Sequence, residues 1–133
     1  MTTRLRITTP YGIFYDDDIE IVTVKTTEGY IGLQYNHVPF ISTIVISTLY
    51  IKNNSSQQKV AAIGGGIIFV EKEYIDIFTD DISWKEDLNE KIIEQDINLV
   101  KTKIDQEKSQ EISRKKNELK LKKLLNQLET IRK

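Results

Sequence analysis

The hydrophobic pattern of this chain changes its period near residue 80, and that change constrains the fold more than any other feature. Before Asp80, runs rich in β-branched residues alternate apolar with polar positions, which is the two-residue period of half-buried strands. After Asp80 the apolar residues recur every three or four positions, as they do in amphipathic helices. The sequence therefore predicts an α+β fold, with a β-rich domain over residues 1–84 and a helical domain over residues 85–133.

Short strand-like runs follow one another closely in the first domain, with glycine, proline and polar residues between them. This spacing predicts a β-sandwich of about ten short strands, or a flattened barrel. The triplet Asp16-Asp17-Asp18 is interpreted as a solvated turn, because it lacks the alternating ligands and the glycine of a calcium loop. The clearest strand-like runs are Leu5–Thr9, Ile19–Thr27, Ile41–Ile51, Val60–Ile63, Ile67–Val70 and Tyr74–Thr79.

Three consecutive glycines, Gly64–Gly66, stand between two of these runs. A phosphate-binding loop would need a Lys-Ser or Lys-Thr pair after its glycines, and a helix beginning there. Here the strand-like run Ile67–Val70 follows instead. We therefore interpret the triplet as a bulge or a sharp bend in the sheet, where backbones come close together.

Two apolar stripes in the second domain predict an antiparallel two-helix hairpin. Asp87 is a candidate N-cap of the first helix, with Glu90 as its capping-box partner, and the polar segment Gln106–Gln110 is the candidate turn. A hairpin of this length buries little surface alone, so we expect it to dock on the sandwich or on a partner. The stripes are Ile93, Ile97, Val100 and Ile104, then Leu121, Leu124, Leu125, Leu128 and Ile131.

The two predicted domains differ in charge, although the net charge of the 133 residues is only −1. Residues 1–84 carry six basic and ten acidic side chains, whereas residues 114–133 carry eight basic and two acidic ones. This asymmetry indicates different partners, and an acidic protein suits the basic segment. Nucleic acid is disfavoured, because the basic segment has no aromatic residue and no recognised motif. The absence of cysteine excludes disulfides and thiolate metal sites.

The segment Thr23–Phe40 is a candidate docking surface. Gly29 and Gly32 bracket the dipeptide Tyr30-Ile31, and glycine is needed where φ is positive or another group comes close. A tight corner, Asn36–Phe40, follows, in which proline restricts its own φ and the conformation of the preceding valine. A constrained and apolar loop of this kind is typical of a surface that a partner covers.

Four motifs have counterparts in one family. Leu5–Gly12 reads LRITTPYG, which is similar to that family's opening strand and TP-x-G turn. Gly29–Phe40 reads GYIGLQYNHVPF, similar to its G-x-x-G-x-x-x-x-H-x-P signature. Ala62–Ile67 is similar to its glycine-rich strand, and Ile77–Asp80 to its final strand. With the predicted sandwich and hairpin, the whole chain resembles the epsilon subunit of F-type ATP synthase.

The resemblance implies a non-catalytic subunit of a rotary motor, with no cofactor or metal of its own. In that family the sandwich binds the gamma subunit and the ring of membrane c subunits, and the three turn together as the rotor. The chain is then expected to be peripheral to the cell membrane on its cytoplasmic side, or less favourably to a plastid thylakoid. Tyr30, Ile31 and His37 are implied to share a loop that faces the ring. The implied interface residues are Gly29, Tyr30, Ile31, Gly32, His37 and Pro39.

The resemblance also implies a role for the hairpin. In the family it lies folded on the sandwich or extends towards the alpha and beta subunits, where it inhibits ATP hydrolysis. Its basic residues then face an acidic segment of the beta subunit, an arrangement in which charge steers a bistable element. The residues implied here are Arg114, Lys115, Lys116, Lys120, Lys122 and Lys123.

The chain departs from the family where the first helix begins. Many bacterial members carry an I/L-D-x-x-R-A segment there, which binds ATP and holds the hairpin down. In this chain Leu88 is followed by Asn89 in place of the aspartate, and Ile92 and Ile93 replace the arginine and the alanine. Because this position then offers no cation to phosphates, we expect weak or absent ATP binding by the isolated subunit.

An enzyme is the poorest alternative. His37 is the only histidine, and no motif pairs it with a nucleophile or base. Carboxylates such as Asp76 and Asp80 have no spacing that singles out a glycosidase pair.

A second alternative is a free-standing binding module with a coiled-coil tail. It would present Tyr30, Tyr35 and Phe40 to a glycan or a peptide. Retention on a glycan or peptide matrix indicates such a module, whereas co-purification with the gamma subunit indicates a rotor component.

Overall fold

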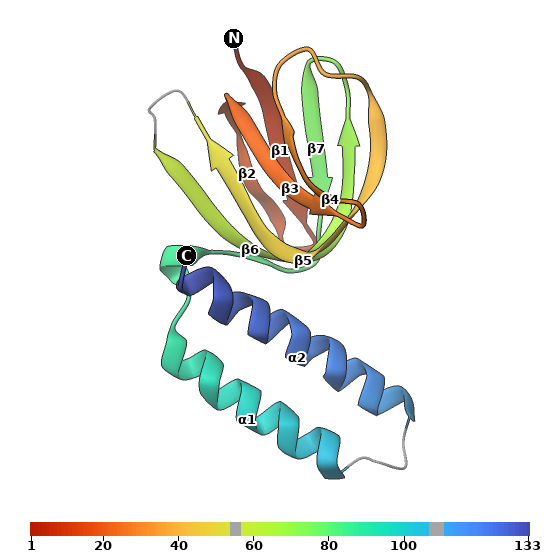
Figure 1. Cartoon of the computed structure of the whole chain (residues 1–133), viewed down its shortest axis with the longest axis vertical. Helices are drawn as coiled ribbons and strands as arrows, with labels where there is room; N and C mark the ends of the chain where they lie inside the picture. Colours follow the sequence, from red (N-terminus) through yellow and green to blue (C-terminus); the bar gives the residue numbers. More distant parts are fainter. Residues whose placement is uncertain (54–56, 107–110) are drawn as a thin grey trace.

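The computed structural model describes residues 1–53, 57–106 and 111–133, and it confirms the predicted fold class: a β-sandwich followed by two helices (Figure 1). The tip of the predicted hairpin at 54–56 and the predicted helix–helix turn at 107–110 lie outside these residues. The elements are β1 (Thr3–Thr9), β2 (Gly12–Ile19), β3 (Ile21–Thr26), β4 (Gly29–Leu33), β5 (Phe40–Lys52), β6 (Gln58–Val70), β7 (Tyr74–Phe78), β8 (Ile82–Trp84), the 3-10 turn η1 (Lys85–Asp87), α1 (Glu90–Gln106) and α2 (Glu111–Ile131).

One continuous sheet forms both layers of the sandwich. Its order is β2-β1-β7-β6-β5-β3-β4, β8 pairs with β6, and only β1 and β7 run parallel among the paired strands described. The first half of β5, Phe40–Ile44, pairs with Gly66–Val70 of β6 beside β7. The second half, Ile46–Lys52, pairs with Gln58–Gly64 beside β3 and β8. The two long strands therefore pass from one layer into the other.

The glycine triplet lies where β6 makes this passage, as the sequence predicted. Gly65 has φ +92 and lies between the ladder pairs Ile44–Gly66 and Ile46–Gly64. Its carbonyl oxygen accepts a 2.5 Å hydrogen bond from Thr79 Oγ1, just after β7 ends. Because a positive φ strains any residue with a Cβ, glycine permits the bend that gives β6 a place in both layers.

The number of strands is eight in the described residues, rather than about ten. The segments Val60–Ile63 and Ile67–Val70 are parts of one strand, β6, because the triplet bends the ladder without ending it. Both β5 and β6 contain 13 residues, so the sandwich has fewer and longer strands than the sequence pattern suggested.

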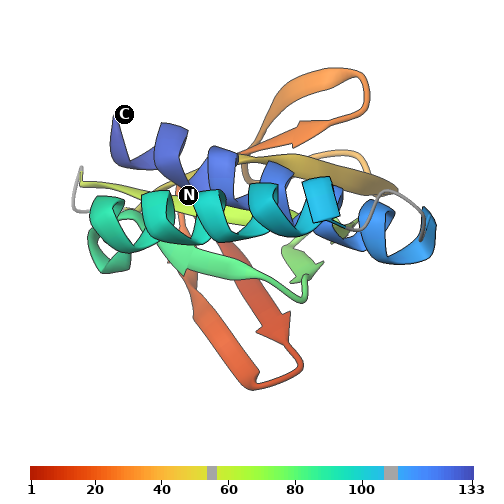
Figure 2. The same cartoon turned by 90° about the horizontal axis from the view of Figure 1, so that it is seen from below.

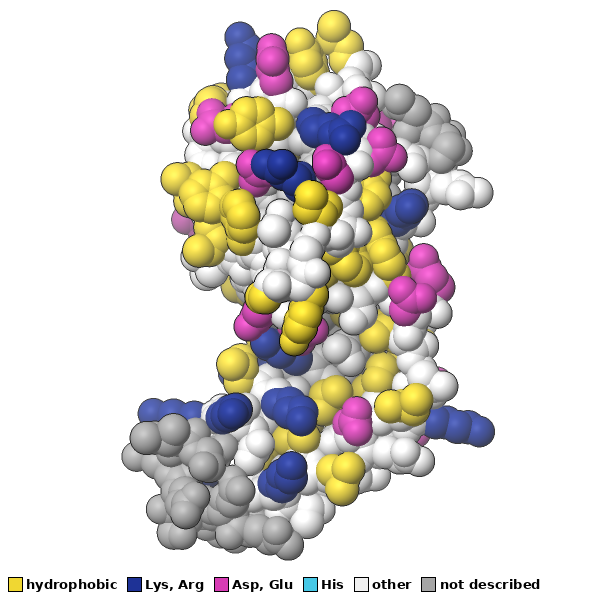
Figure 3. All heavy atoms as spheres, turned by 180° about the vertical axis from the view of Figure 1, so that it is seen from behind, with side chains coloured by type: hydrophobic (Ala, Val, Ile, Leu, Met, Phe, Trp, Pro, Cys, Tyr) yellow, Lys and Arg dark blue, Asp and Glu magenta, His cyan; other side chains and the backbone are white. Residues whose placement is uncertain are grey.

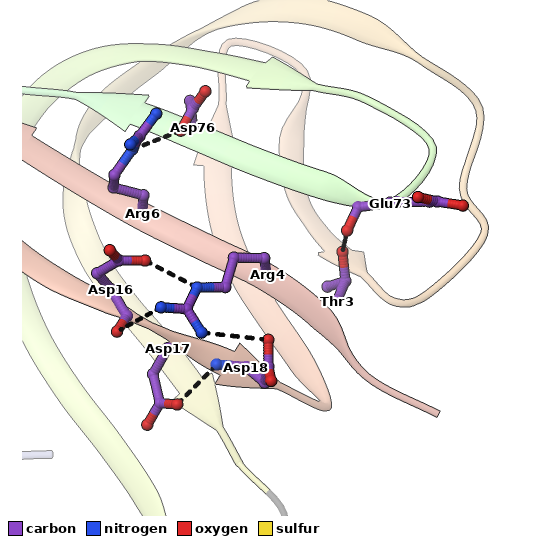
Figure 4. A network of polar contacts seen from close by, with 8 residues as sticks. All are labelled: Thr3, Arg4, Arg6, Asp16, Asp17, Asp18, Glu73 and Asp76. Carbon is purple, nitrogen blue, oxygen red and sulfur yellow. Dashed lines mark hydrogen bonds and ion pairs between the residues drawn. The ribbon is translucent and has the colours of Figure 1, made fainter.

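The acidic triplet lies in β2 and not in a turn, which corrects the sequence interpretation (Figure 4). Arg4 of β1 donates from Nε to Asp16 Oδ1 at 2.8 Å, and its Nη1 lies 3.5 Å from Asp18 Oδ1. That bond to Asp16 raises the pKa of Arg4 above its usual value. Beside it, Arg6 Nε lies 3.3 Å from Asp76 Oδ1 of β7. Carboxylates two residues apart on one strand face thus flank a cation on the next strand.

Two separate apolar cores hold the molecule together. The helix core confirms the first predicted stripe, from Ile93 to Ile104. In the second predicted stripe, Leu125 is half exposed and does not pack with the other four residues. A buried cluster inside the sandwich contains, among others, Leu5, Ile7, Val24, Leu49, Ile63, Ile68 and Ile77. A second cluster between the helices contains Ile93, Ile97, Val100 and Leu124, with Leu88, Ile104, Leu121, Leu128 and Ile131 packed against it.

The helices lie side by side, and α2 lies between α1 and the strands β5 and β6, which it contacts (Figure 1). In the view from below, α1 is in front (Figure 2). Asn126 Nδ2 donates to the carbonyl oxygen of Ser47 in β5 at 2.7 Å. The buried hydroxyl groups of Thr130 in α2 and Thr48 in β5 lie 2.9 Å apart. The expected docking of the hairpin on the sandwich is therefore present, and it includes these polar contacts.

Candidate functional site

The predicted docking surface divides into two pieces at opposite ends of β4. The turn at Thr27–Glu28 precedes this strand, and the segment 34–39, here called the corner loop, follows it at the end of the sandwich away from the helices (Figure 1). Gly29 takes φ +114 after the turn, and Asn36 takes φ +65 in the loop. Gly32 needs no positive φ, but a Cβ there would lie 3.1 Å from Ile21 Cδ1.

Tyr30 and Ile31 lie in β4, so they do not share a loop with His37 as the resemblance implied. The Tyr30 hydroxyl donates to the carbonyl oxygen of Thr48 at 3.3 Å, and its half-exposed ring lies beside Tyr50. Ile31 packs against the sandwich core. The ladder with β3 decides this placement, because it continues through both residues.

The corner loop combines an exposed apolar side chain with a shielded imidazole. Val38 is 79% exposed, beside the exposed ring of Pro39. Both ring nitrogens of His37 are shielded from solvent and have no hydrogen-bond partner among the described residues. Polar atoms shielded from solvent are usually hydrogen-bonded. A partner that covered Val38 and offered a hydrogen-bonding group to His37 would therefore stabilise this loop.

Sequence reasoning missed a second apolar surface, on the outer face of β5, β6 and β7. Ile41 is 68% exposed and pairs in the ladder with Phe69, and the exposed residues Ile67 and Phe78 pair in the same way. Phe69 and Phe78 form an edge-to-face contact at 5.6 Å. We call these four residues the apolar face. The sequence held part of the signal, because Ile67–Val70 is apolar at every position.

The basic residues predicted to contact another subunit all lie on α2. In the space-filling view, several Lys and Arg side chains are visible on the helical part below the sandwich (Figure 3). Arg114 Nε lies 3.1 Å from Glu118 Oε1, one turn along the helix. Lys123 differs from the rest because it points towards the sandwich. Between α2 and the sandwich, Lys123 and Leu119 line a groove of about 610 Å³ whose other wall includes Phe78 and the glycine triplet. The exposed basic residues are Arg114, Lys115, Lys116, Lys120 and Lys122.

Asn89, at the position of the family's aspartate, is the N-cap of α1. Its Oδ1 accepts hydrogen bonds from the backbone N–H groups of Lys91 and Ile92, at 3.0 and 3.3 Å. The predicted cap Asp87 ends the 3-10 turn instead, because the chain is extended at Leu88 before the helix begins. Leu88 and Ile93 pack into the helix core, whereas Ile92 is exposed.

The described residues hold no group of three or more His, Asp or Glu side chains placed to bind a metal ion. Nor do the helices described have both the length and the apolar composition that crossing a bilayer requires.

Known proteins match both parts of this description. A family model for the ATP synthase delta/epsilon chain β-sandwich domain matches residues 2–85. The "ATP synthase epsilon chain" of Mycoplasmopsis pulmonis is 40% identical over 129 residues, covering 96% of this chain and 92% of its own length. The chain belongs to the ATP synthase epsilon chain family. That of Mycoplasma mobile is 48% identical over 115 residues, covering 78% of this chain and 82% of its own length.

The solved structures agree on the fold. A chain in the mitochondrial ATP synthase of Euglena gracilis superimposes with a TM-score of 0.79 at 17% identity, covering 94% of this chain and 78% of that one. As an epsilon chain, the protein is a non-catalytic subunit of the rotary ATP synthase and serves ATP synthesis and ion transport. Epsilon chains belong to the peripheral F1 part of that membrane-bound complex.

Proposed function

We propose that the corner loop of this epsilon chain binds the ring of c subunits. The exposure of Val38 carries this proposal, because covering an exposed aliphatic side chain with a partner removes apolar surface from water and so favours binding. His37 supports it, since a polar group of the ring removes the cost of its unpaired nitrogens. Gly29, Gly32 and Pro39 act indirectly: Gly29 permits the turn at the start of β4, Gly32 leaves room for Ile21, and Pro39 restricts the backbone after the strand.

The gamma subunit is the proposed partner of the apolar face. Ile41, Ile67, Phe69 and Phe78 form one continuous surface across three strands, next to the groove beneath α2. A patch of this kind on one sheet face is typical of protein–protein contacts. With both contacts in place the epsilon chain turns with the rotor, on the cytoplasmic side of the cell membrane. The bacterial relatives support that location.

Changing Val38 to Asp tests the corner contact. A carboxylate at this position must lose water when the ring covers it, so we expect roughly tenfold weaker association with the c-ring. In reconstituted ATP synthase, ATP-driven ion pumping should fall while ATP hydrolysis continues. Ile13→Asp is the matched control, because Ile13 is a β-branched residue that is 60% exposed on β2, outside the proposed contacts. Equal pumping by both variants would contradict the proposal.

The hairpin is proposed to inhibit ATP hydrolysis through its basic residues, which meet an acidic segment of the beta subunit. Lys120 and Lys122 face solvent while α2 lies on the sandwich, so their charge can steer a partner. The separate helix core supports a hairpin that moves as a unit, and the polar contacts under α2 support reversible docking.

Deleting residues 85–133 is expected to raise the ATP hydrolysis rate of the complex and to leave pumping coupled to hydrolysis. The deletion keeps β8, in which Trp84 stacks on Phe14 of the sandwich at 4.7 Å, so residues 1–84 should stay folded. A full-length control with Arg114, Lys120 and Lys122 changed to Gln keeps the hairpin but removes charge. If the charge variant is as active as the deletion, inhibition depends on those charges; unchanged hydrolysis in both speaks against an inhibitory hairpin.

A further inference from the structure

Lys123 is held by the sandwich, unlike its neighbours in the basic segment of α2. Its side chain is only 20% exposed, and its Nζ lies 3.6 Å from Asp80 Oδ1 and 3.9 Å from Asp81 Oδ2. These two carboxylates lie directly before β8, in the segment that connects it to β7. A lysine on the helical hairpin is thus occupied by an acidic dipeptide of the β domain.

The backbone around this contact fixes the acidic dipeptide in place. The N–H of Gly64 donates to the carbonyl oxygen of Asp81 at 2.7 Å, and the N–H of Asp81 donates to Thr79 Oγ1 at 3.3 Å. A Cβ on Gly64 would lie 2.9 Å from Asp81 Cβ and 3.0 Å from Lys123 Cε. The missing side chain of Gly64 therefore leaves the space through which the lysine stem reaches the carboxylates.

The same seam contains uncharged contacts that orient α2. Asn126 bonds to the carbonyl oxygen of Ser47, and Thr130 bonds to Thr48. Their register on the helix places Lys123, almost one turn earlier, over the acidic dipeptide. When the hairpin docks, Lys123 is therefore brought into its ion pairs with the acidic dipeptide at the same time.

We propose that Asp80 and Asp81 take the place of an acidic protein partner within the chain. While the hairpin is docked, these two carboxylates pair with Lys123 and so keep that lysine from binding the partner. The inference rests on the proposed contact between the basic residues of α2 and an acidic segment. Only an undocked hairpin offers Lys123 together with the exposed Lys120 and Lys122. An acidic partner and the dipeptide compete for one ammonium group, so partner binding and hairpin release favour each other.

The contact is weak enough to be exchanged. Both distances exceed those of a charge-assisted hydrogen bond, and the Asp80 side chain is 72% exposed. Exposed ion pairs contribute little and are screened over a Debye length of about 10 Å at 0.1 M salt. Raising the salt concentration should therefore shift the hairpin towards release.

Spin labels measure that release directly, because the chain has no native cysteine. Labels go on cysteines at two exposed positions, Thr43→Cys in β5 and Glu129→Cys in α2. D80N/D81N should broaden the distribution of distances between the two labels towards longer values at low salt. Added salt should change that distribution less in D80N/D81N than in the parent. E20Q/E28Q is the matched control, since it removes two exposed carboxylates elsewhere in the sandwich and gives the same change in net charge.

Binding of a polyglutamate peptide to the full chain tests the masking. We expect D80N/D81N to bind it about two- to fivefold more tightly than the parent and the control, the range that exposed ion pairs allow. Lys123→Gln in the D80N/D81N background should remove that gain. Peptide binding that depends on Lys120 and Lys122 but is equal in all carboxylate variants, with unchanged distances, overturns the inference and leaves the proposed acidic contact intact. No peptide binding by any variant overturns both.

Discussion

Gly66→Ala is expected to destabilise the protein by about 3 kcal/mol, the upper range for overpacking a closely packed site. A Cβ on Gly66 would lie 2.4 Å from the carbonyl oxygen of Phe78, which belongs to the backbone of β7. No rotamer change relieves that clash, so β6 and β7 must move apart at the point where the sheet bends. Urea unfolding followed by the fluorescence of the only tryptophan, Trp84, measures the loss.

Gly32→Ala is the control for this prediction. Its new Cβ would meet Ile21 Cδ1 at 3.1 Å, which is the flexible end of a side chain, and Gly32 has no positive φ. The expected cost is below about 1 kcal/mol, because a small shift of one methyl group is enough. Equal unfolding midpoints for Gly66→Ala and Gly32→Ala would mean that the bend tolerates a side chain.

Ile77→Ala and Ile97→Ala should unfold different parts of the molecule. Ile77 is fully buried in the sandwich core, and its truncation should cost about 3–4 kcal/mol in the Trp84 transition. Ile97 belongs to the small helix core, so its truncation should lower the midpoint of the helical circular dichroism signal and leave the Trp84 transition nearly unchanged. Transitions that shift together in both variants would show that sandwich and hairpin unfold as one cooperative unit.

Sequence reasoning predicted those features that neighbouring residues determine and missed those that depend on the folded chain. The helix stripe from Ile93 to Ile104 was predictable, because periodicity within one helix is local information. The true cap Asn89 was missed in favour of Asp87, since both are good caps and only the extended chain at Leu88 separates them. The acidic triplet was misread for a different reason: Arg4, which makes its place in a strand favourable, lies on another strand, 12 residues before Asp16.

The candidate sites divide in the same way. The sequence singled out the corner at His37 and Pro39 from its glycine and proline pattern. The separation of Tyr30 from that loop needed the ladder between β3 and β4. The apolar face appeared only when Ile41, Phe69 and Phe78 were aligned across three strands.

By itself, the sequence determined the order of a β part and a helical part, the glycine bend, the basic charge of α2 and the family. These depend on period, local conformation and composition, which neighbouring residues carry. The tertiary structure alone decided that β5 and β6 serve both layers, and that Lys123 turns away from its basic neighbours towards Asp80 and Asp81. The reason is physical: strand pairing and ion pairs between distant residues depend on which surfaces the folded backbone brings together. A local sequence pattern does not specify which distant residues become neighbours.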